Sequence, residues 1–478
     1  MLTGFMIFYR EIELALKRFS LFLVVLFLIS AFLKPDHAVF AQEGTTYPTY
    51  AIQSGDTLGL IAIRFGVSVD DIIKINDLEN PDALAIGTEI KIPGLEGISG
   101  KLETRVIKLG EDLHQLSLRT AISEQQIAKM NRLTSSGEVF AGTTLILTQP
   151  QSDDMFQPAG MVNASLTLLE KSLQFDNNFW AILNQNQIVH SWDILPSQQV
   201  FSFQSGQINP ESTNQFELSP LPLVQGKTSQ LTISNPIQNN ISIKFNDQII
   251  PAFSNNGGSI AFIGIPALME SGLYPLTITQ TDSKGESSEF SQYVLVEPGA
   301  FIQESVTGVD SSTVDGSTID QENQILTQYR STNPNRLWNG SFQFPVDEPC
   351  FASTFGNRRS YNNGTYFYYH TGMDFTVCAN NLNIYAAAPG TVIFAGNLPI
   401  KGNFTLIDHG WGIYTGYAHQ VEQFIKVGDT VEKGQRIGSI GNTGRSLGPH
   451  LHWEVWVNGT PVDPLEWVEK SFPLQAED

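Results

Sequence analysis

Histidines gather in the last third of the chain, where their spacing indicates chemistry. Five of the eight lie between residues 370 and 452. His450 and His452 alternate along the apolar stretch Gly448–Trp456, which is typical of a β-strand. Both imidazoles then project from one face, about 6.5–7 Å apart along the backbone. One of them is able to bind a metal while the other serves a water, although such a pair by itself is more often satisfied by hydrogen bonds.

A second pair, His370 and Asp374, stands in the segment His-Thr-Gly-Met-Asp. Zinc accepts imidazole and carboxylate ligands at about 2.0–2.2 Å. Alone, this pair is typical of a turn with a surface ion pair, but one histidine of the 450–452 pair completes a set of three ligands. Three protein ligands leave one tetrahedral position for a water, whose pKa the metal lowers towards about 7. The pattern therefore predicts one catalytic Zn2+ per chain.

The only cysteines of the chain, Cys350 and Cys378, flank the first ligand pair. In a chain that leaves the reducing cytoplasm we expect them to form a disulfide. It would close a loop of about 28 residues and add about 3 kcal/mol in the chain-entropy model. Two metal ligands or two free thiols are the alternative, which the complete histidine set disfavours.

The ligands must be carried by short strands joined by tight turns. Glycines at positions 438, 441, 444 and 448 suit hairpins between such strands. We expect a mostly antiparallel β domain with a groove that receives an extended peptide, either glycine-rich or containing D-amino acids. His409 precedes a glycine and is interpreted as structural.

Eight short motifs are spread over residues 342–467. They are Phe355–Arg359, His370–Asp374, Ala388–Val392, Asp408–Gly410, Tyr417–His419, Val427–Val431, Gly441–Gly444 and Gly448–His452. Together they resemble peptidase family M23, the lysostaphin and LytM type of peptidoglycan endopeptidase. The resemblance implies a zinc metalloendopeptidase that hydrolyses peptide cross-links or stem peptides of the bacterial cell wall.

The same resemblance implies roles for single residues. The zinc ligands are His370, Asp374 and His452. His419 and His450 are catalytic: one takes a proton from the attacking water and the other stabilises the oxyanion, without an assignment of which does which. Tyr417 is a candidate for a further hydrogen bond to the transition state.

Three rival interpretations exist. Inactive relatives that activate another wall hydrolase have lost metal ligands, which this chain keeps. Residues 427–435 resemble the hammerhead segment of biotinyl and lipoyl carrier domains, but residues 441–444 offer no lysine for modification. In a pure glycan-binding adhesin the upstream modules would be the whole function, and chelator-sensitive cleavage of peptidoglycan distinguishes the enzyme from it.

The first half of the chain is repetitive. Residues 50–93 and 105–148 match at an offset of 55 without gaps. Each copy indicates strand, helix, helix and strand, in the order βααβ. The segments Tyr50–Leu58, Phe65–Ser68 and Ile86–Pro93 resemble the LysM module, which binds N-acetylglucosamine-containing glycans such as peptidoglycan.

We therefore predict LysM 1 at residues 48–94 and a divergent LysM 2 at residues 103–149. A further shift of 55 aligns Asn76 with Asn186, which predicts a degenerate LysM-like unit at residues 158–204. An unrelated helical connector is the alternative for this third unit.

Two further segments separate the repeats from the peptidase domain, which is predicted at residues 341–470. Residues 216–297 contain short β-branched runs between turn formers, a pattern that favours an immunoglobulin-like β-sandwich acting as a spacer. Residues 298–340 are polar and are interpreted as a linker.

The N-terminus indicates export. Lys17 and Arg18 precede the apolar run Phe19–Leu33, and Ala41 offers a cleavage site, so residues 1–41 are interpreted as a signal peptide. An uncleaved N-terminal anchor is the alternative and the only expected membrane contact. The predicted location is extracellular or in the cell envelope.

Composition is typical of a modular, folded protein. A chain of 478 residues is too long for a single hydrophobic core and should divide into several domains. Its hydrophobic fraction of 41% is sufficient for folded cores. A formal charge of −21 disfavours nucleic acid as a partner, because that binding needs clustered Lys and Arg.

Overall fold

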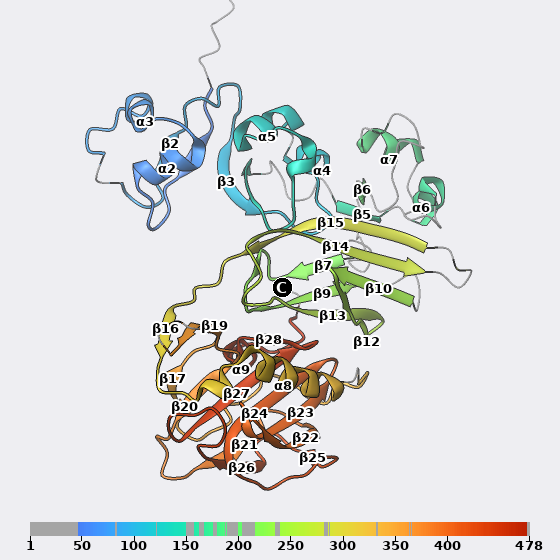
Figure 1. The fold of residues 1–478 in the computed structure, drawn as a ribbon. Helices are drawn as coiled ribbons and strands as arrows, with labels where there is room; N and C mark the ends of the chain where they lie inside the picture. The colour runs from blue at the N-terminus through green and yellow to red at the C-terminus, as the bar shows by residue number, and fades with distance from the viewer. Residues whose placement is uncertain are drawn as a thin grey trace, which may run out of the picture. The chain divides into compact units, whose positions relative to one another are not determined.

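The structure is a computed structural model in which residues 46–475 are described apart from short gaps (Figure 1). The gaps are residues 82–83, 121, 150–156, 162–166, 175–178, 187, 189–198, 203–215, 235–239, 282–284, 286, 331–332, 363 and 365. The predicted export segment, residues 1–41, lies outside the described residues. Within the described part of the chain, no helix combines the length and apolar character needed to span a bilayer.

The first two repeats share one four-stranded sheet with the order β2-β1-β3-β4. Its strands are β1 (Thr49–Ala51), β2 (Glu89–Lys91), β3 (Lys101–Val106) and β4 (Thr144–Thr148). The helices are α2 (Leu58–Phe65) and α3 (Val69–Ile75) in the first copy, and α4 (Leu113–Thr120) and α5 (Glu124–Asn131) in the second, which also holds the short turn η1 (Ser136–Glu138). Both copies have the predicted order βααβ.

Equivalent asparagines in the two copies connect the second helix to the last strand by the same hydrogen bonds. The Asn76 amide donates to the carbonyls of Ile72 and Lys91, and the Asn131 amide donates to those of Ile127 and Ile146. The offset of 55 is therefore repeated in side-chain hydrogen bonding as well as in the apolar core.

A third group of elements follows in the same order: β5 (Gln157–Met161), α6 (Leu168–Gln174), α7 (Phe179–Gln185) and β6 (Gln199–Ser202). β5 and β6 pair antiparallel. The Asn186 amide donates to the carbonyl of Ile182, as Asn76 does to that of Ile72. The degenerate LysM-like unit at residues 158–204 remains a prediction.

Residues 216–297 form two sheets around one core. The first sheet has the order β11-β10-β14-β15-β8 and the second β12-β13-β9-β7. The strands are β7 (Phe216–Ser219), β8 (Leu223–Val224), β9 (Thr228–Ile233), β10 (Asn240–Phe245), β11 (Gln248–Ile250), β12 (Phe253–Asn255), β13 (Gly258–Gly264), β14 (Gly272–Thr281) and β15 (Ser287–Glu297). Ile233 from one sheet and Ile278 from the other are buried together.

The C-terminal domain is mostly antiparallel β, as predicted. Its main sheet has the order β17-β20-β27-β24-β23-β22-β25, with β21, β26 and β28 attached to it. The bounds are β17 (Cys350–Ser353), β18 (Arg358–Tyr361), β19 (Tyr366–Tyr369), β20 (Met373–Thr376), β21 (Asn383–Tyr385), β22 (Gly390–Leu398), β23 (Gly402–Gly410), β24 (Ile413–Gln423), β25 (Thr430–Val431), β26 (Arg436–Ile440), β27 (His450–Val457), β28 (Thr460–Val462) and α9 (Pro464–Glu469).

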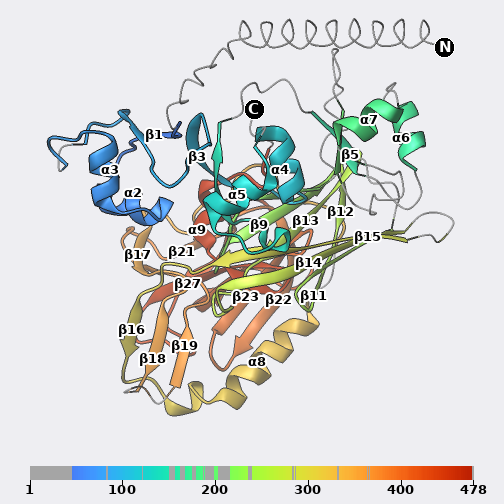
Figure 2. The same ribbon diagram turned by 90° about the horizontal axis from the view of Figure 1, so that it is seen from above.

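The segment predicted as a linker, residues 298–340, instead forms elements that pack on this domain. It contains β16 (Gln303–Val306), η3 (Ser311–Thr313) and α8 (Gly316–Gln328), and β16 pairs with β18 in parallel. Leu326 of α8 is fully buried against side chains of β22, β23, β24 and β27. Both views show α8 beside β22 and β23 (Figures 1 and 2). The linker prediction was wrong because it rested on the polar composition of the segment, although a few apolar residues such as Leu326 are enough to anchor the helix.

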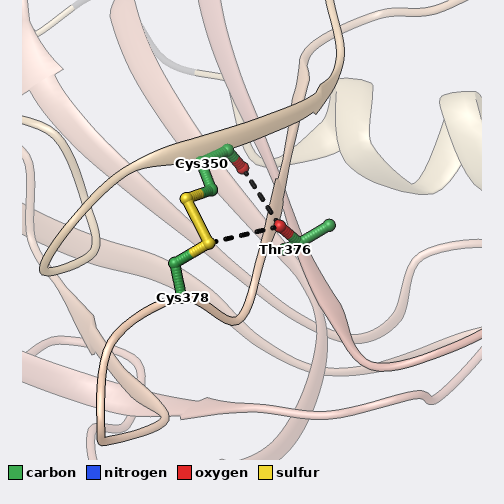
Figure 3. Close-up of a disulfide and its surroundings, with 3 residues drawn as sticks. All are labelled: Cys350, Thr376 and Cys378. Atoms are coloured by element: carbon green, nitrogen blue, oxygen red, sulfur yellow. Dashed lines mark hydrogen bonds between the residues drawn. A yellow bond between two sulfur atoms is a disulfide. The ribbon is translucent and has the colours of Figure 1, made fainter.

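A disulfide joins Cys350 and Cys378, close to the pairing of β17 with β20 (Figure 3). The Thr376 hydroxyl, on β20, donates to the Cys350 carbonyl at 3.5 Å and lies 3.8 Å from the Cys378 sulfur. The closed loop contains His370 and Asp374, so the bond constrains the segment that carries two candidate metal ligands.

Candidate metal centre

Central strands of the C-terminal sheet position the predicted ligands. β20 pairs antiparallel with β27, which places Asp374 opposite His452 and Thr376 opposite His450. β24 lies on the other side of β27 and places Ala418 opposite His452. The site is therefore assembled by main-chain pairing of three adjacent strands, with His370 in the short connection before β20.

Three donor atoms form a tight triangle. The His370 Nε2 atom lies 3.0 Å from Asp374 Oδ1 and 2.9 Å from His452 Nδ1, and the latter two atoms are 2.9 Å apart. All three side chains are buried. A tetrahedral ion with bonds of about 2.0–2.2 Å needs donors roughly 3.3–3.6 Å apart, so the triangle needs to open by only a few tenths of an ångström.

In His370 and His452, the ring nitrogen that points away from the triangle, here called the outer nitrogen, forms a hydrogen bond with another group. His370 Nδ1 donates to the Thr354 carbonyl at 2.9 Å, and His452 Nε2 donates to the Glu454 carboxylate at 2.9 Å. The inner nitrogens therefore present lone pairs to each other and to the Asp374 carboxylate. A cation between these three buried groups would satisfy their lone pairs, and the donor set fits zinc.

Burial and the contacts within the triangle shift the pKa values of the three groups. Burial raises the pKa of Asp374, but the contacts with His370 and His452 outweigh burial and hold the pKa of this carboxyl well below its usual range. Burial lowers the pKa of His452, whereas hydrogen bonds to Asp374 and Glu454 raise it, with a net rise. Burial lowers the pKa of His370, so the triangle combines an ionised carboxylate with one neutral imidazole.

His419 and His450 stand beside the triangle. Their ring centroids are 4.7 Å apart, and His450 Nε2 lies 3.8 Å from Asp374 Oδ1. His419 Nδ1 donates to the Thr443 carbonyl at 2.7 Å, and His450 Nδ1 donates to the Gly448 carbonyl at 2.9 Å. Each imidazole is thus held in the tautomer that leaves Nε2 free of a proton, which is the form that a general base requires.

The backbone at His419 is unusual, because its φ is +62°. The left-handed region is uncommon for residues other than glycine and is found preferentially at functional sites. The His419 N–H donates to the Lys401 carbonyl at 2.8 Å, which holds this conformation. Burial, followed by the neighbouring His450 and His452, lowers the pKa of His419 well below its usual value, so this imidazole is neutral at pH 7.

A cavity of about 380 Å³ opens over these residues. Its lining includes the three ligands and both further histidines, together with aromatic and cationic side chains such as Tyr368 and Arg445. Val306, Ile319 and Glu322 also line it, so the segment before the domain supplies one wall.

Outer residues that the sequence interpretation missed hold the ligands. Glu454 is fully buried and accepts from His452 Nε2, from the Lys401 ammonium at 2.6 Å and from the Thr371 hydroxyl. The charge of Lys401 lowers the pKa of Glu454 against the effect of burial. Its position two residues after His452, on the same strand face, is a signal that the sequence offered.

Tyr417, a candidate for the site, and His409, interpreted as structural, both lie in the core. Tyr417 is fully buried, and its hydroxyl accepts from the Ala387 N–H at 2.9 Å and the Thr415 hydroxyl at 3.0 Å. It is not among the residues that line the cavity, so its expected contact with the transition state is not retained. His409 is fully buried between the Pro389 carbonyl and Thr415, in agreement with a structural role.

A triangle of three candidate ligands with an open side and two further imidazoles beside it is typical of a metal-dependent hydrolase. Residues 368–464 match peptidase family M23, and residues 50–93 and 106–148 match the LysM domain. The chain thus contains an M23 peptidase domain preceded by two LysM domains.

Similar proteins cover only part of the chain. Peptidoglycan DD-endopeptidase ShyA of Vibrio cholerae serotype O1 is 36% identical over 140 residues, which are 29% of this chain and 32% of that protein. DD-carboxypeptidase/endopeptidase Mpg of Neisseria meningitidis serogroup B is 41% identical over 109 residues, which are 23% of this chain and 25% of that protein. The chain thus matches between a quarter and a third of the length of these relatives.

Among solved structures, the catalytic domain of the antimicrobial peptidase lysostaphin from Staphylococcus simulans is 29% identical, with a TM-score of 0.22. The match covers 26% of this chain and 93% of that one.

Proposed function

We propose that the protein is an exported, zinc-dependent endopeptidase that hydrolyses peptide bonds of bacterial peptidoglycan. The observation that carries the proposal is the buried triangle of His370 Nε2, Asp374 Oδ1 and His452 Nδ1, whose edges are 2.9–3.0 Å. The outer ring nitrogens of His370 and His452 already donate to Thr354 and Glu454. The inner nitrogens and the Asp374 carboxylate therefore offer three lone pairs to a cation. Zinc is the ion whose preferred ligands are of this kind.

Bound zinc would supply Lewis acidity, which polarises the scissile carbonyl and acidifies the attacking water. The chain's own residues supply the proton transfer. Either Nε2 atom, that of His419 or that of His450, is free to take the proton of the water. The second imidazole can donate to the developing oxyanion only when its Nε2 carries a proton, so it acts in its imidazolium form. Hydrogen bonds from each Nδ1 to a backbone carbonyl keep both rings oriented for these roles.

Peptidoglycan as the substrate is supported by two independent parts of the chain. The LysM domains belong to a class of module that binds N-acetylglucosamine-containing glycans, and the relatives ShyA and Mpg carry names that refer to peptidoglycan DD-endopeptidase or DD-carboxypeptidase/endopeptidase activity. We propose that LysM 1 and LysM 2 hold glycan strands, with the unit at residues 158–204 as a third LysM-like module. The pair of sheets at residues 216–297 would be an immunoglobulin-type spacer.

Other interpretations fit the chain less well. An inactive M23-like activator would not need a complete ligand set with two oriented imidazoles beside it. The carrier interpretation needs a lysine at a hairpin tip, which residues 441–444 do not supply. An adhesin would use the LysM domains alone and would leave the buried triangle without a purpose.

Digestion of purified peptidoglycan by the full-length chain tests the proposal. We expect soluble fragments with a newly cleaved peptide bond, detected by mass spectrometry, and loss of this release with a chelator and its return with zinc. His450→Ala is the matched negative control, because it keeps the ligand triangle and removes one proton-transfer group. Cleavage that persists in excess chelator, or intact peptides in the digest, would exclude the proposed activity.

A further inference from the structure

A carboxylate from outside the family-matched residues 368–464 approaches the metal centre. Glu304 lies on β16, in the segment predicted as a linker, and is the register partner of Arg359 on β18. The Arg359 Nε atom donates to Glu304 Oε2 at 3.1 Å. On the other side, Arg359 Nη2 donates to Asp374 Oδ2 at 3.0 Å. One guanidinium thus bridges Glu304 and a metal ligand.

The bridge acts on the oxygen of Asp374 that faces away from the triangle. Because Oδ2 accepts from Arg359, the Oδ1 atom remains directed at His370 Nε2 and His452 Nδ1. A carboxylate held by one oxygen presents the other as a single, oriented ligand. Arg359 is therefore well placed to set the angle at which Asp374 meets a cation.

Glu304 in turn fixes Arg359. Its carboxylate also accepts from the Ser353 hydroxyl at 2.9 Å and from the Asn357 amide at 2.5 Å, so it is anchored from three sides. Burial raises the pKa of Glu304, but the hydrogen bonds from Ser353 and Asn357 and the charge of Arg359 lower it overall, so the group is ionised. Its negative charge offsets the guanidinium that would otherwise repel a cation a few ångströms away.

We propose that Glu304 is a positioning residue for the metal ligand Asp374, acting through Arg359, so that residues 303–306 are part of the metal site. This inference rests on the metal centre proposed above. Replacement of residues that orient metal ligands typically costs about 10–100-fold in metal affinity. The expected effect of Glu304→Gln is therefore a loss of zinc affinity of roughly tenfold or more.

The test measures zinc dissociation constants of the full-length chain by competition with a chromophoric chelator, and the visible absorption of the Co2+-loaded form. Glu304→Gln should weaken zinc binding and alter the cobalt spectrum, because the ligand geometry changes. Glu304→Asp, which keeps the charge, should restore part of the affinity. Glu297→Gln removes an exposed carboxylate seven positions away and should leave both readouts unchanged.

A second variant distinguishes a role of Glu304 in orienting Asp374 from a role in merely attaching the segment with β16 and α8 to the domain. Leu326→Ala opens a cavity under α8 without touching Arg359, so it should lower the melting temperature and leave zinc affinity unchanged. Equal zinc affinity in Glu304→Gln and the wild-type chain would overturn the positioning role alone, as would an equal loss in Leu326→Ala. A wild-type chain that binds no zinc would overturn the metal centre itself, and the positioning role with it.

Discussion

Asp374 and His452 are direct partners across β20 and β27, and their Oδ1 and Nδ1 atoms lie 2.9 Å apart. Two central strands of the sheet, rather than loops, therefore set the distance between two ligands, which favours precise geometry. His450 shares β27 with His452, but its Nε2 atom lies 3.8 Å from the Asp374 oxygen, outside the triangle.

This difference predicts separate effects of the two histidines. His452→Ala should lose both zinc and activity, because one of three ligands is removed. His450→Ala should keep one zinc per chain and lose peptide hydrolysis by about 10²–10⁴-fold, the usual range for a proton-transfer group. Elemental analysis of the purified variants and rates on soluble muropeptides measure the two effects. Zinc at full affinity in His370→Ala would show that the ligand set is wrong.

Stability should fall in mild acid because of His409. Burial lowers the pKa of this imidazole to about 4, despite the opposing hydrogen bond to the Pro389 carbonyl. The unfolded chain has a histidine pKa of about 6.5, so it binds more protons than the folded chain as the pH falls from about 6.5 to about 4. About 3 kcal/mol of the free energy of unfolding is lost over that window, since each pKa unit is worth about 1.4 kcal/mol.

Urea unfolding at pH 7 and at pH 4.5 measures this loss. His409→Gln keeps a hydrogen-bonding side chain without a titration and should have a smaller difference between the two pH values. The same difference in wild type and variant would assign the acid sensitivity to other groups.

The disulfide should stabilise the domain that holds the metal. Cys350 and Cys378 are separated by 28 residues, and the loop that they close includes His370 and Asp374. Replacing both cysteines by serine should lower the free energy of unfolding by about 3 kcal/mol, mainly because the unfolded chain gains freedom. Chemical denaturation of the metal-free protein provides the measurement, and reduced wild type should match the double variant.

The LysM domains should contribute retention on the wall rather than chemistry. Deleting residues 42–204 should weaken co-sedimentation with sacculi and spare hydrolysis of soluble muropeptides, because no described residue of that segment lines the cavity at the candidate metal centre. Ala141 pairs with Val294 of β15, so the truncation exposes a strand that the second LysM domain covers. Unchanged sedimentation would exclude a targeting role, and circular dichroism checks that the shortened chain remains folded.

Much of the site was predictable from the sequence because its signals are local. An alternating strand places His450 and His452 on one face, and the spacing of four residues places His370 beside Asp374. The repeats were equally visible, since the offset of 55 preserves both the apolar positions and the asparagines at 76 and 131.

Only the tertiary structure decided which distant residues meet the site. Parallel pairing of β16 with β18 brings Glu304 to Arg359 across 55 residues, and no periodicity in a polar segment indicates such a pairing. Tyr417 was misplaced by the same limit: β24 brings His419 to the candidate metal centre, but it buries the Tyr417 phenol in the core. Residue types and spacing thus predicted the candidate metal ligands, whereas long-range strand pairing decided which distant residues lie against them.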